Sequence, residues 1–422
     1  MSKVAHLYDV FNNKDKQPFL IMKKILFVLA AAVLVTAGCS TLSDSYGDYS
    51  APGTSTGDYI SGADKADKGG EGEETPKPVN GVLTAGEWKD LDNWQFWGNL
   101  LNKKEWSDYE SYWKFYTHNM VYVKLSDSAG NPSVGVDVTI SDGNGVVWSA
   151  VSDNKGIAVL WADLYAGDKT SGTIEGYEVK VAGKVMDGPI AVTTLSSTEL
   201  AINEYEVAKP TVQDAIDVAF IVDATGSMGD EINFLREDLM KIVEFVGKQV
   251  TAKLRTGVVF YRDEGDEFLT IRNKFTEKVD ETVKYIGEKG LANGGGDYPE
   301  AVHSALECGL QNLDWNTEAR SRVAFLILDA PPHHNDEVIT DLQHHIAKYA
   351  EMGIHIIPVA ASGIDKSTEH LLRSFALATN ATYVFLTNDS GVGDSHIEAS
   401  VGEYKVEKLL DLIVRLIVEY AQ

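Results

Sequence analysis

The chain has 422 residues, of which 44% are hydrophobic and 24% charged, and its formal net charge at pH 7 is −26. This length and composition allow two or three packed domains of about 150 residues each. The negative charge argues against a nucleic-acid-binding protein, because phosphates are bound through a basic surface. The only cysteine besides Cys39, at the end of an N-terminal apolar run, is Cys308, which lies in an apolar helical pattern, so we expect no intramolecular disulfide framework.

The sequence MKKILFVLAAAVLVTAGC, residues 22–39, has the pattern of a secretory signal, with two lysines, an apolar run and small residues at its end. The apolar run is shorter than the roughly 20 residues of a comfortable membrane span. The segment TAGCS resembles a bacterial lipobox, although Thr36 stands where the motif usually has an aliphatic residue. The resemblance implies lipidation of Cys39 and a place in the cell envelope, at the periplasmic face or the surface of the outer membrane. An ordinary cleaved signal with an incidental cysteine is the alternative.

Two contrasting segments follow the signal. Residues 40–84 are rich in Ser, Gly, Asp, Lys, Thr and Glu and have no periodic apolar face, which predicts a disordered tether. Residues 85–118 contain five of the eight tryptophans. Two interpretations remain open for these indoles: a carbohydrate-stacking platform, or a short helical or looped segment that packs onto the next domain.

Residues 119–207 have the alternating pattern of short antiparallel strands. Hydrophobic residues recur at every second position from Val121 to Leu125 and from Val134 to Ile140, and the turns read DSAG, DGNG and DNKG. Further strands are expected at the following positions: Ile157–Leu160, Tyr177–Val181 and Glu199–Ile202. The pattern predicts a small all-β sandwich. The stretches VKLSDSAGNPSVGVDVTI and AVSDNKGIAVL resemble carboxypeptidase-regulatory-like or transthyretin-like domains.

Residues 208–422 alternate between apolar runs and amphipathic patterns. Buried strands are predicted at five positions: Ile216–Val222, Leu254–Tyr261, Arg322–Leu328, Ile354–Ala360 and Thr382–Leu386. Helices are predicted between them, including one from Ile232 to Val246 and a last one beginning at Val406; Cys308 falls in another apolar helical pattern and is interpreted as a small core residue. Continuous apolar strands that alternate with helices predict a doubly wound, mostly parallel α/β sheet that follows the all-β sandwich.

Polar residues follow three of the predicted elements of this sheet. The segments DATGS (223–227), GGGDYPE (294–300) and LILDAPPHH (326–334) bring oxygen-bearing side chains to strand ends and helix starts. Ligands bind beyond the carboxyl ends of the strands in such sheets. Carboxylates, hydroxyls and water are the ligands of Mg²⁺ or Mn²⁺. The candidate ligands are Asp223, Thr225, Ser227, Asp297 and Asp329.

These three segments, in this order, resemble the von Willebrand factor A family. DATGS is similar to its metal-ion-dependent adhesion motif, Asp-x-Ser-x-Ser, with Thr225 at the first serine. The resemblance implies that Thr225 and Ser227 bind the metal directly, while Asp223 and Asp329 hold its waters. The segments YRDEGDEF, GGGDYPEAV and DAPPHH are most similar to the bacterial and alpha-kinase-associated branch.

The sequence departs from the family at its usual third hydroxyl ligand, which Asp297 replaces. A direct carboxylate ligand lowers the effective charge of the cation, so we expect firmer metal binding and weaker capture of acidic partners. The alternative is that Asp297 caps a helix that starts at Pro299. Two further features remain open: His333, His334, His344 and His345 are either a zinc site or surface residues, and the four acids of residues 261–268 are a candidate for an added cation site.

The sequence favours a lipid-anchored binding protein, in which a divalent cation captures an acidic side chain of a protein partner. The sandwich and the tryptophan-rich segment would be a rigid spacer. Two alternatives remain: a metal-dependent hydrolase or phosphotransferase, and a structural component of a surface assembly with a fold-stabilising metal. Ser227 does not lie in a Gly-x-Ser-x-Gly motif and no Walker loop is present, so we expect no enzyme activity.

Overall fold

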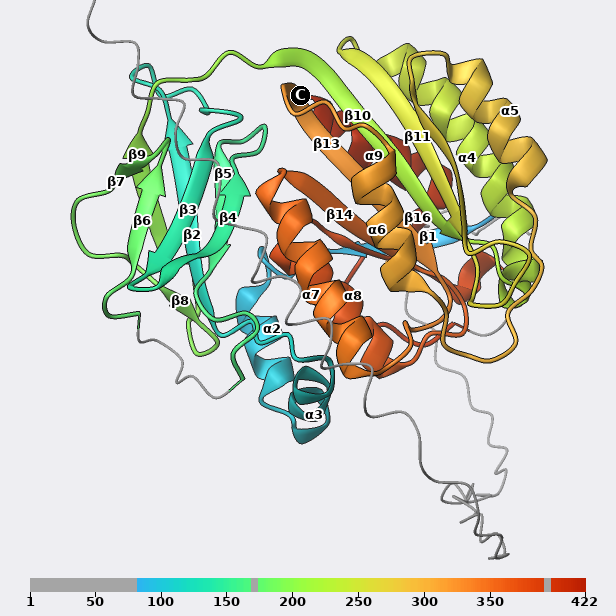
Figure 1. Cartoon of the computed structure of the whole chain (residues 1–422), viewed down its shortest axis with the longest axis horizontal. Coiled ribbons are helices and arrows are strands. Elements are labelled where there is room, and N and C mark those ends of the chain that lie inside the picture. Colours follow the sequence, from blue (N-terminus) through green and yellow to red (C-terminus); the bar gives the residue numbers. More distant parts are fainter. Residues whose placement is uncertain (1–81, 168–173, 391–395) are drawn as a thin grey trace, which may run out of the picture. The chain divides into compact units, whose positions relative to one another are not determined.

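The computed structural model describes residues 82–167, 174–390 and 396–422 (Figure 1). The predicted signal with Cys39, and all of the predicted tether except its last three residues, lie outside the described residues. Within these ranges, no helix combines the length and the apolar character needed to cross a bilayer.

An eight-stranded mixed sheet forms the larger part of the structure, in the order β12-β11-β10-β13-β14-β15-β1-β16. Its five central strands are parallel to one another. They are β11 (Lys253–Tyr261), β10 (Gln213–Asp223), β13 (Ala319–Leu328), β14 (Ile354–Ala360) and β15 (Tyr383–Leu386). All five strands predicted from the apolar runs are present, because a sheet covered on both faces needs apolar residues on both sides of each strand.

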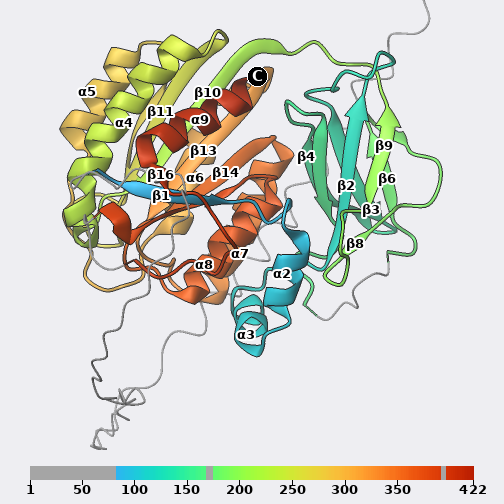
Figure 2. The ribbon, with the colours of Figure 1, turned by 180° about the vertical axis from the view of Figure 1, so that it is seen from behind.

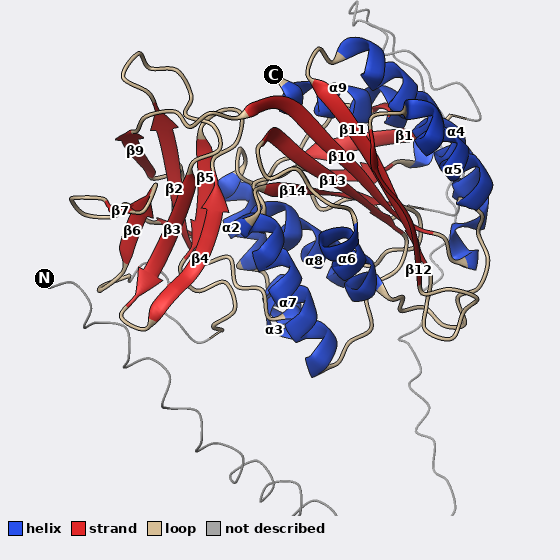
Figure 3. Cartoon of the chain, turned by 45° about the horizontal axis from the view of Figure 1, so that its top comes forward, coloured by secondary structure: helices blue, strands red, loops and turns tan. Residues whose placement is uncertain are grey.

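Helices cover both faces of this sheet (Figures 1 and 3). One face packs against α4 (Gly229–Gln249), α5 (Val279–Lys289) and α9 (Leu409–Ala421), and the other against α6 (Val302–Asn312), α7 (Asp336–Glu351) and α8 (Lys366–Ala378). The architecture is the predicted doubly wound α/β fold. Cys308 of α6 is a buried core residue, as expected. The last helix begins later than predicted: Val406 is 39% exposed and precedes the short strand β16 (Glu407–Lys408).

The tryptophan-rich segment belongs to this α/β domain rather than to a separate layer. Its first strand, β1 (Thr84–Trp88), runs antiparallel to both β15 and β16 inside the large sheet, as Figure 2 shows from behind. Helices α2 (Trp94–Leu101) and α3 (Lys104–Trp113) follow. All five indoles of the segment are at most 8% exposed. They therefore form core contacts, and the structure supports the packing interpretation, because a carbohydrate platform needs exposed ring faces.

A buried ionic cluster holds α2 and α3 against α8. The Arg373 guanidinium donates to both carboxylate oxygens of Asp90, at 2.8 and 2.5 Å, and also contacts Glu369 at 3.4 Å. It stacks near the ring of Trp97, 4.8 Å from the centroid. These charged groups are almost fully buried, and each finds an opposite charge. We call these residues the arginine cluster.

The remaining strands form two four-stranded sheets, as expected for a β-sandwich. One contains β2 (Asn119–Ser126), β5 (Ile157–Trp161), β8 (Thr193–Thr194) and β9 (Ile202–Glu206); the other contains β3 (Asp137–Asp142), β4 (Gly145–Val151), β6 (Glu178–Val181) and β7 (Lys184–Val185). The strand predicted over Glu199–Ile202 is shifted along the chain. At Ala201 the backbone amide donates to the hydroxyl of Thr193 instead of entering a strand ladder, and β9 begins at the next residue.

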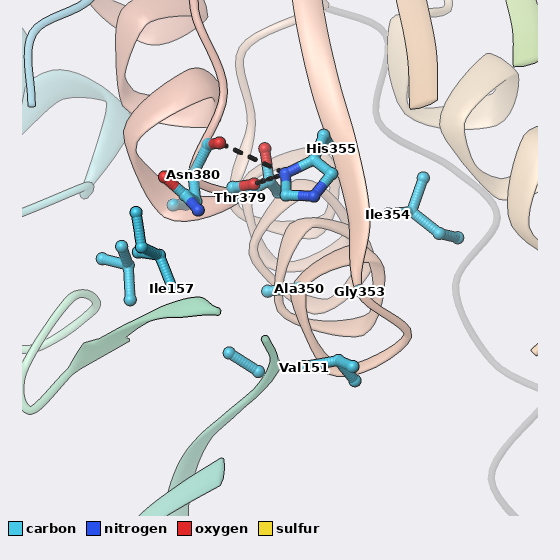
Figure 4. Close-up of a pocket in the computed structure, with 11 residues that line it drawn as sticks. Val151, Ile157, Ala350, Gly353, Ile354, His355, Thr379 and Asn380 are labelled. Atoms are coloured by element: carbon cyan, nitrogen blue, oxygen red, sulfur yellow. Dashed lines mark hydrogen bonds between the residues drawn. The ribbon is translucent and has the colours of Figure 1, made fainter. Parts of the chain in front are cut away.

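The sandwich and the α/β domain meet at a tightly packed junction (Figure 4). The Nδ1–H of His355 donates to the carbonyl of Thr379 at 2.8 Å, and the Asn380 amide donates to Asp153 of the sandwich at 2.9 Å. The cavity between them measures about 10 Å³, about the minimum that holds one water molecule. This junction is structural and leaves no room for a ligand.

Candidate metal-binding site at the strand ends

Two neighbouring parallel strands deliver carboxylates to the same edge of the sheet. Val222 of β10 pairs with Ile327 of β13, so Asp223 and Asp329 emerge side by side just beyond those residues. Both are buried, at 0% and 3% exposure. The structure therefore brings together the two aspartates that the sequence placed at these strand ends.

The two predicted hydroxyl ligands lie beside Asp223. One carboxylate oxygen of Asp223, Oδ1, accepts hydrogen bonds from the backbone N–H of Thr225 at 2.9 Å and from its hydroxyl at 2.7 Å. The Thr225 and Ser227 hydroxyl oxygens are 3.1 Å apart. Thr225 is buried whereas Ser227 is exposed, so this cluster of oxygens reaches the surface at Ser227. A short 3-10 turn, Gly226–Met228, produces the spacing before α4 begins.

A third carboxylate, Glu300, joins this cluster although the sequence reasoning did not select it. Glu300 is 2% exposed, and its backbone N–H donates to the Pro331 carbonyl at 2.9 Å, which ties it to the segment after β13. Gly295 is in the left-handed region (φ 72°), and a Cβ there would lie 2.9 Å from Glu300 Oε1 and 3.1 Å from Thr225 Cβ. The glycine run is therefore what lets this loop close over the carboxylates.

Each of the three carboxylates has one oxygen without a hydrogen bond. These atoms are Asp223 Oδ2, Asp329 Oδ1 and Glu300 Oε2, and all are buried within the part of the chain that the structure describes. An unpaired buried oxygen costs free energy, since its hydration is lost without replacement. The cluster therefore has capacity for a cation that no described side chain supplies.

The pKa values of the three carboxylates show the same lack of a compensating positive charge. Burial raises the pKa of Asp223, although its hydrogen bonds from Thr225 act in the opposite direction. Burial and then the charge of Asp223 raise the pKa of Asp329. Burial and the charges of the surrounding aspartates raise the pKa of Glu300 to about 9. In each case the charged form is disfavoured by desolvation and by like charges, which a bound cation would relieve.

The structure does not bring the fifth predicted ligand, Asp297, into the cluster. Its side chain is exposed in the loop before α6, and no hydrogen bond connects it to the other candidates among the described residues. The alternative role as a helix cap is also not observed, because α6 starts at Val302 with Ala301 in the capping position. The glutamate three residues further on in GGGDYPE occupies the buried position instead.

The acids of residues 261–268 support the loops rather than form a separate site. Asp266 accepts a hydrogen bond from the backbone of Gly295 at 2.9 Å, and Asp263 contacts His333 Nε2 at 2.7 Å. The Arg262 guanidinium, 4% exposed, donates to the Ala224 carbonyl at 3.0 Å. This segment holds the loop that carries the glycine run and the loop that follows β10.

The four histidines are dispersed over different contacts. His333 pairs with Asp263, and His334 stacks on Tyr112 with ring centroids 3.6 Å apart. On α7, His344 is exposed whereas His345 is buried. In the ranges that the structure describes, no group of three or more His, Cys, Asp or Glu side chains is arranged to hold a metal ion on its own. The histidines therefore do not form the zinc site considered above.

The donor set at the strand ends fits a hard cation only when hydroxyls and water are included. Three carboxylates and the Thr225 and Ser227 hydroxyls are all oxygen donors, and Mg²⁺ commonly keeps several waters beside one or two carboxylates. Sulfur and imidazole ligands, which softer metals prefer, are not part of this cluster. The chemistry of the residues thus agrees with Mg²⁺ or Mn²⁺.

Residues 217–393 match the family model for the von Willebrand factor A domain. An ariadne-like RING finger protein of Acanthamoeba polyphaga mimivirus is 36% identical over 124 residues, which are 29% of this chain and 12% of that protein. Alpha-protein kinase vwkA of Dictyostelium discoideum is 30% identical over 126 residues, 28% of this chain and 19% of the kinase. The chain thus spans less than a fifth of the length of either relative.

Among solved structures, the pilus adhesin SpaC from Lactobacillus rhamnosus GG, in its open conformation, aligns with a TM-score of 0.35 and 11% identity. The alignment covers 50% of this chain and 30% of SpaC. Proximal thread matrix protein 1 from the mussel byssus aligns with a TM-score of 0.33 and 16% identity, over 50% of this chain and 47% of that protein.

Proposed function

We propose, from the premise that this chain contains a von Willebrand factor A domain at residues 217–393, that it is a protein-binding module of the cell envelope that recognises its partner through a divalent cation. Domains of this family often take part in protein interaction and adhesion. The observation that carries the proposal is the buried cluster of Asp223, Asp329 and Glu300, in which each carboxylate has an oxygen without a partner.

Thr225, Ser227 and the three carboxylates would hold the cation, Mg²⁺ or Mn²⁺. Asp223 already positions the Thr225 hydroxyl through its Oδ1 atom, which leaves Oδ2 for the ion or its waters. The bound cation would supply an electrophilic position for an anionic oxygen of a partner. Ser227 lies at the exposed rim, where an acidic side chain of a protein partner would reach the site.

Glu300 alters the expectation that the sequence attached to Asp297. A carboxylate in place of a neutral hydroxyl lowers the effective charge of the cation, so the site should bind metal more firmly and acidic partners less strongly. In the structure, the buried carboxylate that fits this role is Glu300, while Asp297 is exposed. We therefore propose that Glu300→Thr, and not Asp297→Thr, weakens metal binding and strengthens the capture of acidic ligands.

We propose a binding role rather than catalysis at this site. The Ser227 hydroxyl contacts the Thr225 hydroxyl, and no described histidine donates to it or accepts from it. A serine nucleophile needs a neighbouring base, and His333 is instead paired with Asp263. The alternative, a hydrolase or phosphotransferase, predicts metal-dependent turnover of generic phosphate or ester substrates that Asp223→Ala abolishes.

Attachment to the envelope is part of the proposal and rests on the signal pattern at residues 22–39 and on Cys39. Lipidation at Cys39 would place the folded domains at the end of a polar tether on the outer membrane, at its periplasmic face or at the cell surface. Cys39→Ser is expected to release the protein from the membrane fraction, and labelling of the wild type with a palmitate analogue tests the modification directly.

Calorimetric titration of Mg²⁺ and Mn²⁺ into the purified protein tests the central claim. Micromolar to millimolar binding is expected for the wild type and none for Asp223→Ala. Asp214→Ala is the matched control, because Asp214 lies at the other end of the same strand and is exposed. Equal heats in all three proteins, or none in any of them, would contradict the proposal. A chelator-sensitive pull-down then separates partner recognition from a purely structural metal.

A further inference from the structure

A second feature of the surface is a cleft that the metal proposal does not use. It measures about 470 Å³ and lies between α3 and the loops that precede α6, α7 and α8. From α3 it receives Tyr109, Tyr112 and Trp113, and from the loops Tyr298 and Asp365, together with three prolines. Figure 2 shows α3 beside α8 at this place. We call it the tyrosine cleft.

The walls of the tyrosine cleft are held in place before any ligand arrives. The Trp113 indole N–H donates to the hydroxyl of Ser367 at 2.9 Å, which joins α3 to the start of α8. The ring of Tyr112 stacks on His334, with centroids 3.6 Å apart and an interplanar angle of 14°. Lys114 pairs with Asp336 at 2.8 Å on the outer side. Preorganised walls reduce the entropic cost of binding.

Three of the four tyrosine and tryptophan side chains of the cleft are already hydrogen-bonded at their polar ends. The Tyr109 hydroxyl donates to Glu105 at 2.7 Å, and the Tyr298 hydroxyl donates to the Gly363 carbonyl at 2.8 Å. The Trp113 indole N–H is taken by Ser367. The cleft therefore offers mainly ring faces and proline rings and few free hydrogen-bonding groups.

The charge at the cleft is negative. No lysine or arginine lines it among the described residues, whereas Asp108 and Asp365 both do. Asp108 is paired with Lys104. One oxygen of Asp365, Oδ1, accepts from the backbone and the hydroxyl of Thr368, both at 2.7 Å, and no hydrogen bond to Oδ2 is found in the described ranges. Asp365 thus retains one oxygen for a ligand.

Asp365 acts on the neighbouring Tyr112. Burial and then the charge of Asp365 raise the pKa of Tyr112. The carboxylate is also the N-cap of α8, where the helix contributes only about half a positive charge. The full charge of Asp365 exceeds this, so the field in the cleft favours a cation.

We propose that the tyrosine cleft binds a lysine or arginine side chain of an extended, proline-containing peptide from a protein partner. The ammonium or guanidinium group would lie against the ring faces of Tyr112 and Tyr298 and pair with Asp365, because cations are attracted to the faces of aromatic rings. The aliphatic stem and neighbouring prolines would pack on Tyr109 and on the prolines of the cleft. This interaction requires no metal and is independent of the function proposed above.

A carbohydrate is the competing ligand for an aromatic cleft. Sugars need several hydrogen-bonding groups that point into the site, and here the polar groups of Tyr109, Tyr298 and Trp113 are bonded to the protein, which leaves the Tyr112 hydroxyl as the one tyrosine group for such a contact among the residues of the cleft. A cation with an apolar stem needs only ring faces and one carboxylate, which are the groups that remain. The charge and the hydrogen bonding together favour the basic peptide.

Fluorescence anisotropy with a labelled, blocked peptide of four Pro-Lys repeats tests the proposal on the full chain in chelator. The same peptide with glutamine in place of lysine is the ligand control. Asp365→Asn removes the charge and keeps a good helix cap. Asp280→Asn is its matched control, because Asp280 is an exposed acid at the start of a different helix, α5. Tyr112→Leu removes an exposed ring while it keeps apolar volume.

We expect the lysine peptide to bind and the glutamine peptide not to bind. Asp365→Asn should weaken binding about tenfold or more, Tyr112→Leu about three- to tenfold, and Asp280→Asn less than about twofold. Equal binding of both peptides, no binding of the lysine peptide, or equal effects of Asp365→Asn and Asp280→Asn would overturn the proposal. So would saturable displacement of the peptide by cellohexaose or chitohexaose, since it would identify the cleft as a sugar site.

Discussion

The arginine cluster and the carboxylate site at the strand ends are equally buried but differ in how their charges are compensated. In the arginine cluster, Arg373 donates to both oxygens of Asp90 and also contacts Glu369. At the strand ends, Asp223, Asp329 and Glu300 lie together without a described cation, and each has an oxygen that no group satisfies.

This difference distinguishes charges that stabilise the fold from a candidate cation-binding site. A buried charge with its partner in place is bound into the fold, and it fixes how α2 and α3 pack on α8. A group of buried like charges is tolerated when a cation compensates it or when a carboxylate keeps its proton, since desolvation and mutual repulsion both disfavour the fully charged form. The sign of a mutation's effect should therefore differ between the two regions.

The largest effect is expected from Arg373→Met. The change leaves Asp90 buried without its positive partner, while Glu369 keeps Lys366 at 2.9 Å, and the loss costs about 3–5 kcal/mol of unfolding free energy. Urea denaturation measures it. Lys104→Met is the control, because its ion pair with Asp108 is exposed and contributes no more than about 1 kcal/mol. Similar losses in the two variants would mean that burial of the arginine cluster is not what stabilises it.

The opposite result is expected from Asp223→Asn. In chelator, the variant should be at least as stable as the wild type, because it removes a buried charge and keeps an oxygen for the Thr225 hydrogen bonds. With Mg²⁺ at about 100 times its dissociation constant, the wild type should gain about 2.7 kcal/mol and the variant nothing. Thermal unfolding with and without the ion measures both. A large loss of stability in chelator would place Asp223 with the structural charges.

The metal-free protein should lose stability as the pH rises. The pKa of Glu300 is raised from 4.5 to about 9, so the folded state retains a proton that the unfolded state has released. The resulting stabilisation is complete below about pH 4.5 and disappears as the pH passes through about 9. Urea unfolding in chelator over this range should show the decline, and Glu300→Gln should flatten it. A profile that is the same in both proteins would contradict this role of Glu300.

An effect confined to acidic pH is expected beside the arginine cluster, and it has the opposite pH direction. Burial and then the charge of Arg373 lower the pKa of His370 to about 3, so its folded form stays neutral while the unfolded form takes up a proton below about 6.5. Stability from this residue is present above about pH 6.5 and is lost towards pH 3. His370→Phe should reduce this acid sensitivity in thermal unfolding. Parallel profiles for the variant and the wild type would exclude His370 as its source.

The sequence predicted the parts of the site that follow directly from strands. Asp223 and Asp329 come immediately after long apolar runs, and parallel strands end at the same edge, so their meeting followed from the pattern. Thr225 and Ser227 lie within four residues of Asp223, so the same pattern placed them at this edge of the sheet. Glu300 was missed because it precedes a helix across an irregular loop, where no periodic pattern assigns a direction to the side chain. The run of three glycines before it, residues 294–296, was the signal that the sequence offered.

Asp297 shows the same limit, because the sequence does not indicate in which direction a side chain of this loop points. It is an acid in the expected segment, but a loop that turns through Gly294 and Gly295 directs the glutamate inward and leaves Asp297 exposed. For the tryptophan-rich segment, the sequence favoured indoles that pack onto the next domain. It did not reveal that β1 is a strand of the large sheet. That pairing joins residues about 300 positions apart, such as Ala85 and Leu386.

By itself, the sequence determined the doubly wound fold, the order of its strands along the chain and the identity of the residues at two strand ends. These properties are local, because hydrophobic periodicity acts over neighbouring residues. Tertiary structure alone decided which carboxylate completes the site, which charges are compensated and where α3 forms a cleft with distant loops. Each of these depends on burial and on the charges of residues far away in the chain, which no local pattern records.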